Sequence, residues 1–173
     1  MSFDAFMYIP SEKTLEGETQ DDDMSKEKAF EILSFEIGAE NNINIGSISA
    51  GGGAGKATFK ECTVTKKTDT SSCGLFAKLC EGGHIQDVHI VLRRSGGAAG
   101  KSGATFLKFD FKLVMIQDIS WSGSDGDDIC EETIVLQYGA MKVEYLQQDI
   151  KGEMKKHSDA MWSRVKNKAE LVV

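Results

Sequence analysis

The sequence predicts a mostly β protein with a curved sheet, as in a barrel or a strongly coiled sheet, and one α-helix in the body of the chain. Three observations lead there. Apolar and polar residues alternate through Thr105–Trp121, which is the period of a strand with one buried face. That run is longer than most strands, so it must bend. Only Asp69–Glu81 has a convincing helical pattern, and the glycines cluster in short segments typical of turns.

The first half of the chain is expected to alternate strands with polar loops. Leu33, Phe35 and Ile37 recur at every second position, which places them on one face of a strand and Ser34 and Glu36 on the other. In chain order we expect a strand at Met1–Ile9, an acidic loop at Ser11–Lys28 and a strand at Ala29–Asn41. A loop rich in Asn, Ser and Gly follows at Asn42–Gly55, and then a strand rich in Thr and Lys at Lys56–Lys67.

The helix is expected over Asp69–Glu81. Asp69, Thr70 or Ser71 can cap its N-terminus, because short polar side chains accept hydrogen bonds from the first free backbone N–H groups. The glycine pair after Glu81 ends it. Its apolar stripe is Leu75, Phe76 and Leu79.

The second half is expected to contain three strands, at Ile85–Arg94, Thr105–Trp121 and Glu131–Leu146. A glycine-rich turn, Ser95–Ala104, connects the first two, and an acidic loop, Ser122–Cys130, connects the last two. The first of these strands should bury Val88, Ile90 and Leu92. The predicted buried face of the long strand consists of Leu107, Phe109, Phe111, Leu113, Met115 and Ile119.

The last predicted strand changes phase. Its apolar residues stand at even positions up to Tyr138 and at odd positions from Met141. Gly139 lies at the change, and we expect a β-bulge there to keep one apolar face and turn the strand. The tail Gln147–Val173 is polar and is expected to be anchored by its few apolar residues, Met161, Trp162 and Val165.

Bulk properties limit the function. At 173 residues the chain is expected to be one domain covering residues 1–173. Its net charge of −7 argues against nucleic acid or an anionic membrane as a partner. The N-terminus has no basic segment before an apolar one, so we expect no signal peptide, and no apolar run is long enough to insert in a membrane. We therefore expect folding in the cytoplasm, with any export depending on recognition of the folded protein.

The four cysteines are expected to be reduced thiols, buried or partly buried. No CxxC pair occurs, and the spacing of Cys62, Cys73, Cys80 and Cys130 fits no zinc template. Cys73 and Cys80 are seven residues apart in the predicted helix, too far along its axis for a disulfide.

Motifs for catalysis or cofactor binding are not convincing. The segments Gly51–Lys56 and Gly96–Ser102 imitate a phosphate-binding loop, but each lacks the leading glycine and runs into a predicted strand instead of a helix. The acidic segment Asp125–Asp128 places Ile129 where a calcium loop needs an oxygen ligand, so we interpret it as a solvated turn. We expect no enzyme activity, no cofactor and no metal.

The predicted strands favour a subunit that assembles. Exposed strand edges invite pairing with another chain, and long loops rich in Gly and Ser can lie on a neighbour. The alternative is a monomeric or dimeric β-barrel that binds a ligand in a concave site. A nucleotide-dependent enzyme is a third hypothesis, which the poor phosphate-loop matches disfavour.

Four segments together resemble the Hcp family, the tube proteins of bacterial type VI secretion systems. They are Gly17–Asp21, Gly51–Ala57, Thr65–Asp69 and Tyr138–Asp149, and the resemblance extends over residues 1–165. It implies a compact, partly open β-barrel with one flanking α-helix and no catalysis. It also implies a homo-hexameric ring, stacking of rings into a tube inside a contractile sheath with a tip (spike) protein, and expulsion from the cell with small effector proteins in the lumen.

The resemblance also implies which residues make contacts. The loop that lies on neighbouring subunits or rings would include Asn42, Ile43, Asn44, Ile45, Gly51, Gly52, Gly53 and Lys56. Glu36, together with Ser34 on the same face of its strand, would face the lumen of the ring and influence the choice of cargo.

Overall fold

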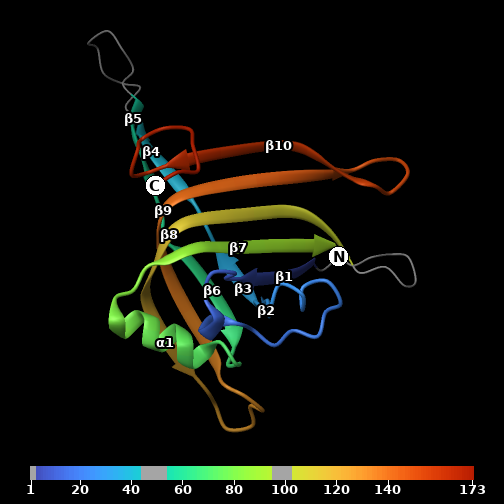
Figure 1. Cartoon of the computed structure of the whole chain (residues 1–173), viewed down its shortest axis with the longest axis vertical. Coiled ribbons are helices and arrows are strands. Elements are labelled where there is room, and N and C mark those ends of the chain that lie inside the picture. The colour runs from blue at the N-terminus through green and yellow to red at the C-terminus, as the bar shows by residue number, and fades with distance from the viewer. Residues whose placement is uncertain (1–2, 44–53, 95–102) are drawn as a thin grey trace.

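A computed structural model of the chain describes residues 3–43, 54–94 and 103–173. Within these ranges it contains ten strands, one α-helix and one short 3-10 helix, arranged as Figure 1 shows. In chain order they are β1 (Phe3–Tyr8), η1 (Lys13–Leu15), β2 (Phe30–Glu31), β3 (Ser34–Glu36), β4 (Ala39–Ile43), β5 (Ala54–Phe59), β6 (Cys62–Lys67), α1 (Ser72–Glu81), β7 (Ile85–Arg94), β8 (Ala104–Ser122), β9 (Glu131–Gln148) and β10 (Met154–Ser163).

Eight strands form one antiparallel sheet. Seven of them follow the order β2-β1-β7-β8-β9-β6-β3, and β10 also pairs with β9. The long strand β9 shares one edge between two partners, because its first residues pair with β6 and its residues from Ala140 onward pair with β10. Strands β4 and β5 form a separate two-stranded sheet that projects from the body (Figure 1).

The segment from Phe30 to Glu36 joins the two ends of the main sheet. Its first part pairs with β1 as β2, and its last part pairs with β6 as β3. Between them, Ile32 N–H donates to the carbonyl of Ala5 at 3.0 Å, and Leu33 N–H donates to the carbonyl of Thr65 at 2.7 Å. The sheet therefore curls on itself without closing, which confirms the predicted partly open barrel.

This crossing corrects the single strand predicted over Ala29–Asn41. The chain leaves one edge and joins the other, so the predicted strand is divided among β2, β3 and β4. Leu33, predicted to share a face with Phe35 and Ile37, lies at the crossing and is 54% exposed. Phe35 and Ile37 do pack against the core. The predicted strand Lys56–Lys67 is likewise divided, between β5 and β6.

The core of the barrel comes from the inner face of the main sheet. Val88, Ile90 and Leu92 of β7 are buried, as alternation predicted. The same core includes Met7, Leu15, Phe30, Cys62, Val64, Leu75, Ile85, Phe111, Val114, Ile116, Ile134, Leu136 and Tyr138. A smaller cluster on the outer face of β1 and β7 is covered by the loop that contains Met24 and Ala29.

Three neighbouring strands reverse their buried face at one row, formed by Gln86, Leu113 and Gly139. On one side of the row the buried residues of β7 and β8 include Val88 and Phe111, and on the other side Ile85 and Val114. The pairing register of β8 with β7 and with β9 is the same on both sides of the row. Leu113 has a φ of 51° there, a left-handed conformation that is costly for leucine.

Two predictions prove wrong at this row, the β-bulge at Gly139 and part of the buried face of β8. No extra residue is inserted at Gly139, because β8 and β9 keep their register across it; the register shift in this pair of strands lies at Gln117 instead. The predicted buried face of β8 holds from Leu107 to Phe111 and again at Ile119, which packs against the core, but it fails at Met115, which is 37% exposed. A Cβ on Gly139 would lie 3.2 Å from the Cβ of Leu113, so glycine leaves room for the unusual leucine opposite it.

The four cysteines are free thiols, as predicted, but three of them are not buried. Cys62 is buried, and burial raises the pKa of its thiol to about 12. Cys73, Cys80 and Cys130 are exposed. The polar tail, for which no strand was predicted, contains β10, because its residues from Met154 to Ser163 complete the edge that β9 offers.

Helix α1 begins at Ser72, after Asp69 accepts hydrogen bonds from the backbone N–H and the hydroxyl of Ser71. Gly82 ends it with a φ of 64°, as predicted. Leu75 is buried against the barrel, whereas Phe76, assigned to the same apolar stripe, is 49% exposed.

A buried ionic cluster joins the start of α1 to the sheet. Lys66 on β6 is fully buried, and its Nζ lies 2.7 Å from Asp69 Oδ1 and 2.6 Å from Glu132 Oε1. Glu132 on β9 also accepts hydrogen bonds from Ser72 Oγ at 2.9 Å and from Trp121 Nε1 at 2.7 Å. The buried charges of Lys66 and Glu132 are thus paired with each other and hydrogen-bonded, which is the condition for burying them.

Gly74→Ala should destabilise the protein by about 2 kcal/mol or more, although alanine is the better helix former. A Cβ at this position would lie 2.1 Å from the carbonyl oxygen of Thr14, so η1 and α1 would have to separate. Urea unfolding measures the change. The control is Cys73→Ala at the exposed neighbouring position, which should change the free energy of unfolding by at most about 0.5 kcal/mol. Equal midpoints for both variants would contradict the close packing.

Lys66→Met should lower the free energy of unfolding by about 3–5 kcal/mol, because it leaves the carboxylate of Glu132 buried without its cation. Adding Glu132→Gln to this variant should recover part of the loss, since a neutral amide still accepts the Trp121 hydrogen bond. Lys67→Met, at the exposed next position, serves as the control in the same denaturation experiment. A double variant less stable than Lys66→Met would show that charge burial is not the cause.

Candidate assembly surface

The first component of the candidate site is the projecting arm, formed by β4 and β5. Its register pairs Ala39 with Phe59 and Ile43 with Ala54. Every residue of β4 is exposed, and neither strand pairs with the main sheet. The arm therefore adds little to the packing of the barrel, and its exposed backbone and side chains are available to another chain.

Three of the predicted contact residues lie on this arm. Asn42 and Ile43 belong to β4 and are not part of a loop, and Ile43 is 58% exposed. Lys56 lies on β5 and is exposed. The other predicted contact residues, Asn44, Ile45, Gly51, Gly52 and Gly53, fall outside the described residues.

The second component is the outer face of β3, β6, β9 and β8, which we call the polar face. Both lumen-facing candidates, Ser34 and Glu36, lie on it and are exposed. The register aligns four hydroxyl residues in one row across the four strands: Ser34, Thr65, Thr133 and Ser120. The hydroxyl oxygens of Ser34 and Thr65 are 2.5 Å apart.

The neighbouring row of the polar face contains Glu36, Thr63, Val135 and Asp118 in register. The residues at its two ends, Glu36 and Asp118, are acidic, and the two between them, Thr63 and Val135, have short uncharged side chains. Glu36 and Thr63 of this row also line a hollow of about 310 Å³ at the edge of the polar face. Alternation alone placed Ser34 and Glu36 together, but it could not reveal the hydroxyl row, which depends on the strand register.

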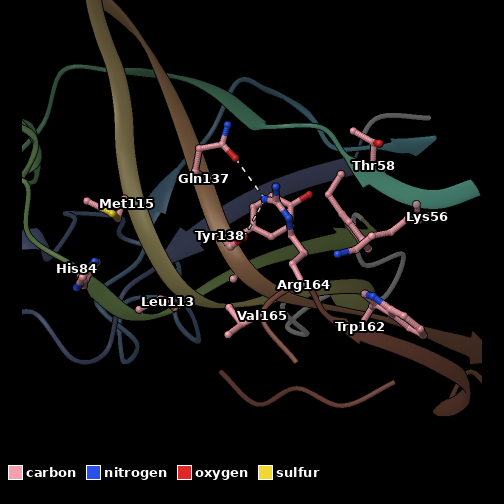
Figure 2. Close-up of a pocket in the computed structure, with 13 residues that line it drawn as sticks. Lys56, Thr58, His84, Leu113, Met115, Gln137, Tyr138, Trp162, Arg164 and Val165 are labelled. Atoms are coloured by element: carbon pink, nitrogen blue, oxygen red, sulfur yellow. Dashed lines mark hydrogen bonds between the residues drawn. The ribbon is translucent and has the colours of Figure 1, made fainter. Parts of the chain in front are cut away.

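The third component is a groove of about 560 Å³ between the base of the arm and the end of β10. Figure 2 shows side chains from β5, β8, β9 and the segment after β10 around it. Lys56, Thr58 and Phe59 come from the arm, and Trp162 and Val165 come from the C-terminal part. The remaining lining residues are Ala57, His84, Leu113, Met115, Gln137, Tyr138, Gly139 and Arg164.

Arg164 fixes the wall of this groove. Its Nη1 donates to the carbonyl of Tyr138 at 2.9 Å and to Gln137 Oε1 at 3.3 Å (Figure 2). The guanidinium also stands over the rings of Phe59 and Tyr138. The hydroxyl of Tyr138 donates to the carbonyl of Lys60 at 2.7 Å, and burial raises the pKa of this phenol to about 12, so it stays neutral.

Elsewhere the outer face is charged and self-paired. On β7, β8, β9 and β10, acidic and basic residues alternate across strands and form ion pairs such as Asp87 with Lys112 and Lys142 with Asp159. Asp110 lies 2.5 Å from Nδ1 of His89. Burial opposes ionisation of Asp110, but the His89 contact and the nearby lysines outweigh it, so its pKa lies below the ordinary value.

Of the residues that line the groove, Lys56 was predicted as a contact residue and the others were not predicted as part of a site. Trp162 and Val165 were expected only as anchors of the tail, and Arg164, Tyr138 and Gln137 were given no role. The sequence signal is weak because the groove is assembled from segments far apart in the chain. Within the described ranges, no three metal-binding side chains come together, and no helix there is both long and apolar enough to span a bilayer.

Sequence comparison identifies relatives of this chain. A family model described as "Type VI secretion system effector, Hcp" matches residues 6–145. Protein hcp1 of Pseudomonas aeruginosa is 27% identical over 97 residues, a stretch that covers 56% of this chain and 58% of that protein.

Solved structures resemble the fold over nearly the whole chain. A structure titled as that of a type six secretion system protein has a TM-score of 0.85 and 28% identity, covering 96% of this chain and 99% of the other. Hcp1 from Salmonella typhimurium has a TM-score of 0.70 and 26% identity, covering 97% of this chain and 99% of its own.

Replacing Asp110 by asparagine should make stability less sensitive to acid. A carboxyl group with a lowered folded-state pKa stabilises the native state above its unfolded pKa, and this contribution is lost as pH falls through the folded-state pKa. The variant lacks this contribution, so its free energy of unfolding should fall less between about pH 5 and pH 2. Urea titrations across this range test it; parallel curves for the two proteins would contradict it.

Proposed function

Because the chain belongs to the Hcp family of type VI secretion proteins, we propose that it is a structural subunit of the type VI secretion tube. Six copies close into a ring, and rings stack into a tube. The observation that carries the proposal is the projecting arm. A two-stranded sheet with a fully exposed first strand contributes little to its own barrel, and it can lie on a neighbouring subunit of the same ring or of the next ring, with Asn42, Ile43 and Lys56 among the contacts.

The polar face is proposed to line the lumen. Its row of hydroxyl groups and its flanking carboxylates, which include Ser34 and Glu36, would meet the surface of a small effector protein without binding it tightly. Such a surface suits cargo that must be released. The tube would be assembled in the cytoplasm, surrounded by a contractile sheath, capped by a spike protein and then expelled from the cell. No step of this role requires catalysis or a cofactor.

The oligomeric state separates this proposal from its alternative, a monomeric or dimeric β-barrel that binds a ligand in the groove. Gel filtration with light scattering should give a ring of six chains, and negative-stain images should show annular particles. A single species of the chain mass, 18.9 kDa, at micromolar concentration would contradict the tube subunit and favour the ligand-binding module.

Shortening the arm should weaken assembly without unfolding the barrel. We would replace residues 43–54 by an Asn-Gly turn, which suits a two-residue hairpin. Since β4 buries no residue, the free energy of unfolding of the monomer should change by less than about 0.5 kcal/mol, while the ring should dissociate at higher protein concentration than the unaltered chain. An unfolded variant would show that the arm belongs to the folding core.

A further inference from the structure

The groove at the base of the arm has a charge opposite to that of the protein. The chain has 27 acidic and 20 basic residues, yet the groove is lined by Lys56, Arg164 and His84 and by no acidic residue. Neither Lys56 nor Arg164 forms an ion pair within the described ranges. The groove also presents apolar surface from Trp162 and Val165. Its composition therefore fits an occupant that is both anionic and partly apolar.

The turn between β8 and β9 has the complementary composition. This acidic tip, residues Ser122–Cys130, carries Asp125, Asp127 and Asp128 and contains no basic residue. Asp127 Oδ2 accepts the backbone N–H of Ser124 at 2.8 Å, which orders the turn, and no ion pair involves the tip within the described ranges. Ile129, next to the carboxylates, is 47% exposed.

The acidic tip cannot reach the groove of its own subunit. It lies at one end of the long axis of the molecule, and the arm lies at the other end (Figure 1). Lys56–Phe59 of the arm form one wall of the groove. An acidic tip that fills such a groove must therefore come from a second copy of the chain. A contact between two different surfaces of identical subunits can be repeated from one copy to the next. It gives an open stack when the rotation between copies does not close it into a ring.

We propose that the acidic tip of one subunit docks in the groove of a subunit in the next ring. The carboxylates of Asp125 and Asp128 would lie against Lys56 and Arg164, and Ile129 would pack on Trp162 and Val165. This inference rests on the proposed tube function and adds to it the surfaces by which rings join. Rim charges of this kind steer association and are screened by salt, so stacking should weaken as ionic strength rises.

Cross-linking tests the contact in the unaltered chain. A carbodiimide joins a lysine amine to a carboxylate only where the two touch. In a mixture of ¹⁴N- and ¹⁵N-labelled protein at low salt, mass spectrometry should find mixed-isotope links between Lys56 and Asp125, Asp127 or Asp128. Rings that yield no such link, or whose Lys56 is joined to other carboxylates only, would overturn the docking.

Charge exchange tests it independently. Lys56→Glu and Asp128→Lys should each shorten stacks in negative-stain images by about five-fold, and the double variant should recover to within about two-fold of the unaltered chain. Lys13→Glu and Asp22→Lys change the same charges at other exposed positions and are the matched controls, which should not show this reciprocal rescue. A double variant no better than the single ones would overturn the contact while leaving the ring intact; the absence of rings in the unaltered chain would overturn the proposed function as well.

Discussion

The reversal of the buried face at Gln86, Leu113 and Gly139 is the constraint on which the other features depend. It occurs without an inserted residue, so the register of three strands is kept while the sheet changes the side that it turns to the core. A left-handed leucine costs about 1–2 kcal/mol, and it is accommodated because a glycine stands opposite it. Two different outer surfaces result, the polar face and the self-paired charged face, with the groove at the bend between them.

The sequence predicted those parts of the fold that are decided locally. Strand β7 was predicted with its observed bounds, and the long strand β8 within one residue at each end, because alternation is a property of the strand itself. The division of Ala29–Asn41 into three strands was not predictable, since it depends on which sheet edge each residue meets. Strand β10 was missed for the same reason: its sequence is polar, and it is a strand because β9 offers it an edge.

The candidate site was predictable only where resemblance to a family supplied it. That resemblance pointed to the arm and to Ser34 and Glu36, and the structure places the described members of both sets at exposed positions. The groove could not be anticipated, because its walls come from β5, β8, β9, the segment before β7, β10 and the residues after β10. The ionic cluster around Lys66 was equally hidden, since Glu132 reaches it from a strand that is distant in sequence.

The edges of the main sheet decide whether a further strand can add to it. Its two terminal strands, β2 and β3, have two and three residues, and the longer edge of β10 carries several charges and a register shift near His157. Short, charged or irregular edges are poor templates for uncontrolled strand addition. The edges of the main sheet therefore offer little to a foreign strand, which leaves the separate sheet of β4 and β5 as the place where another chain can pair.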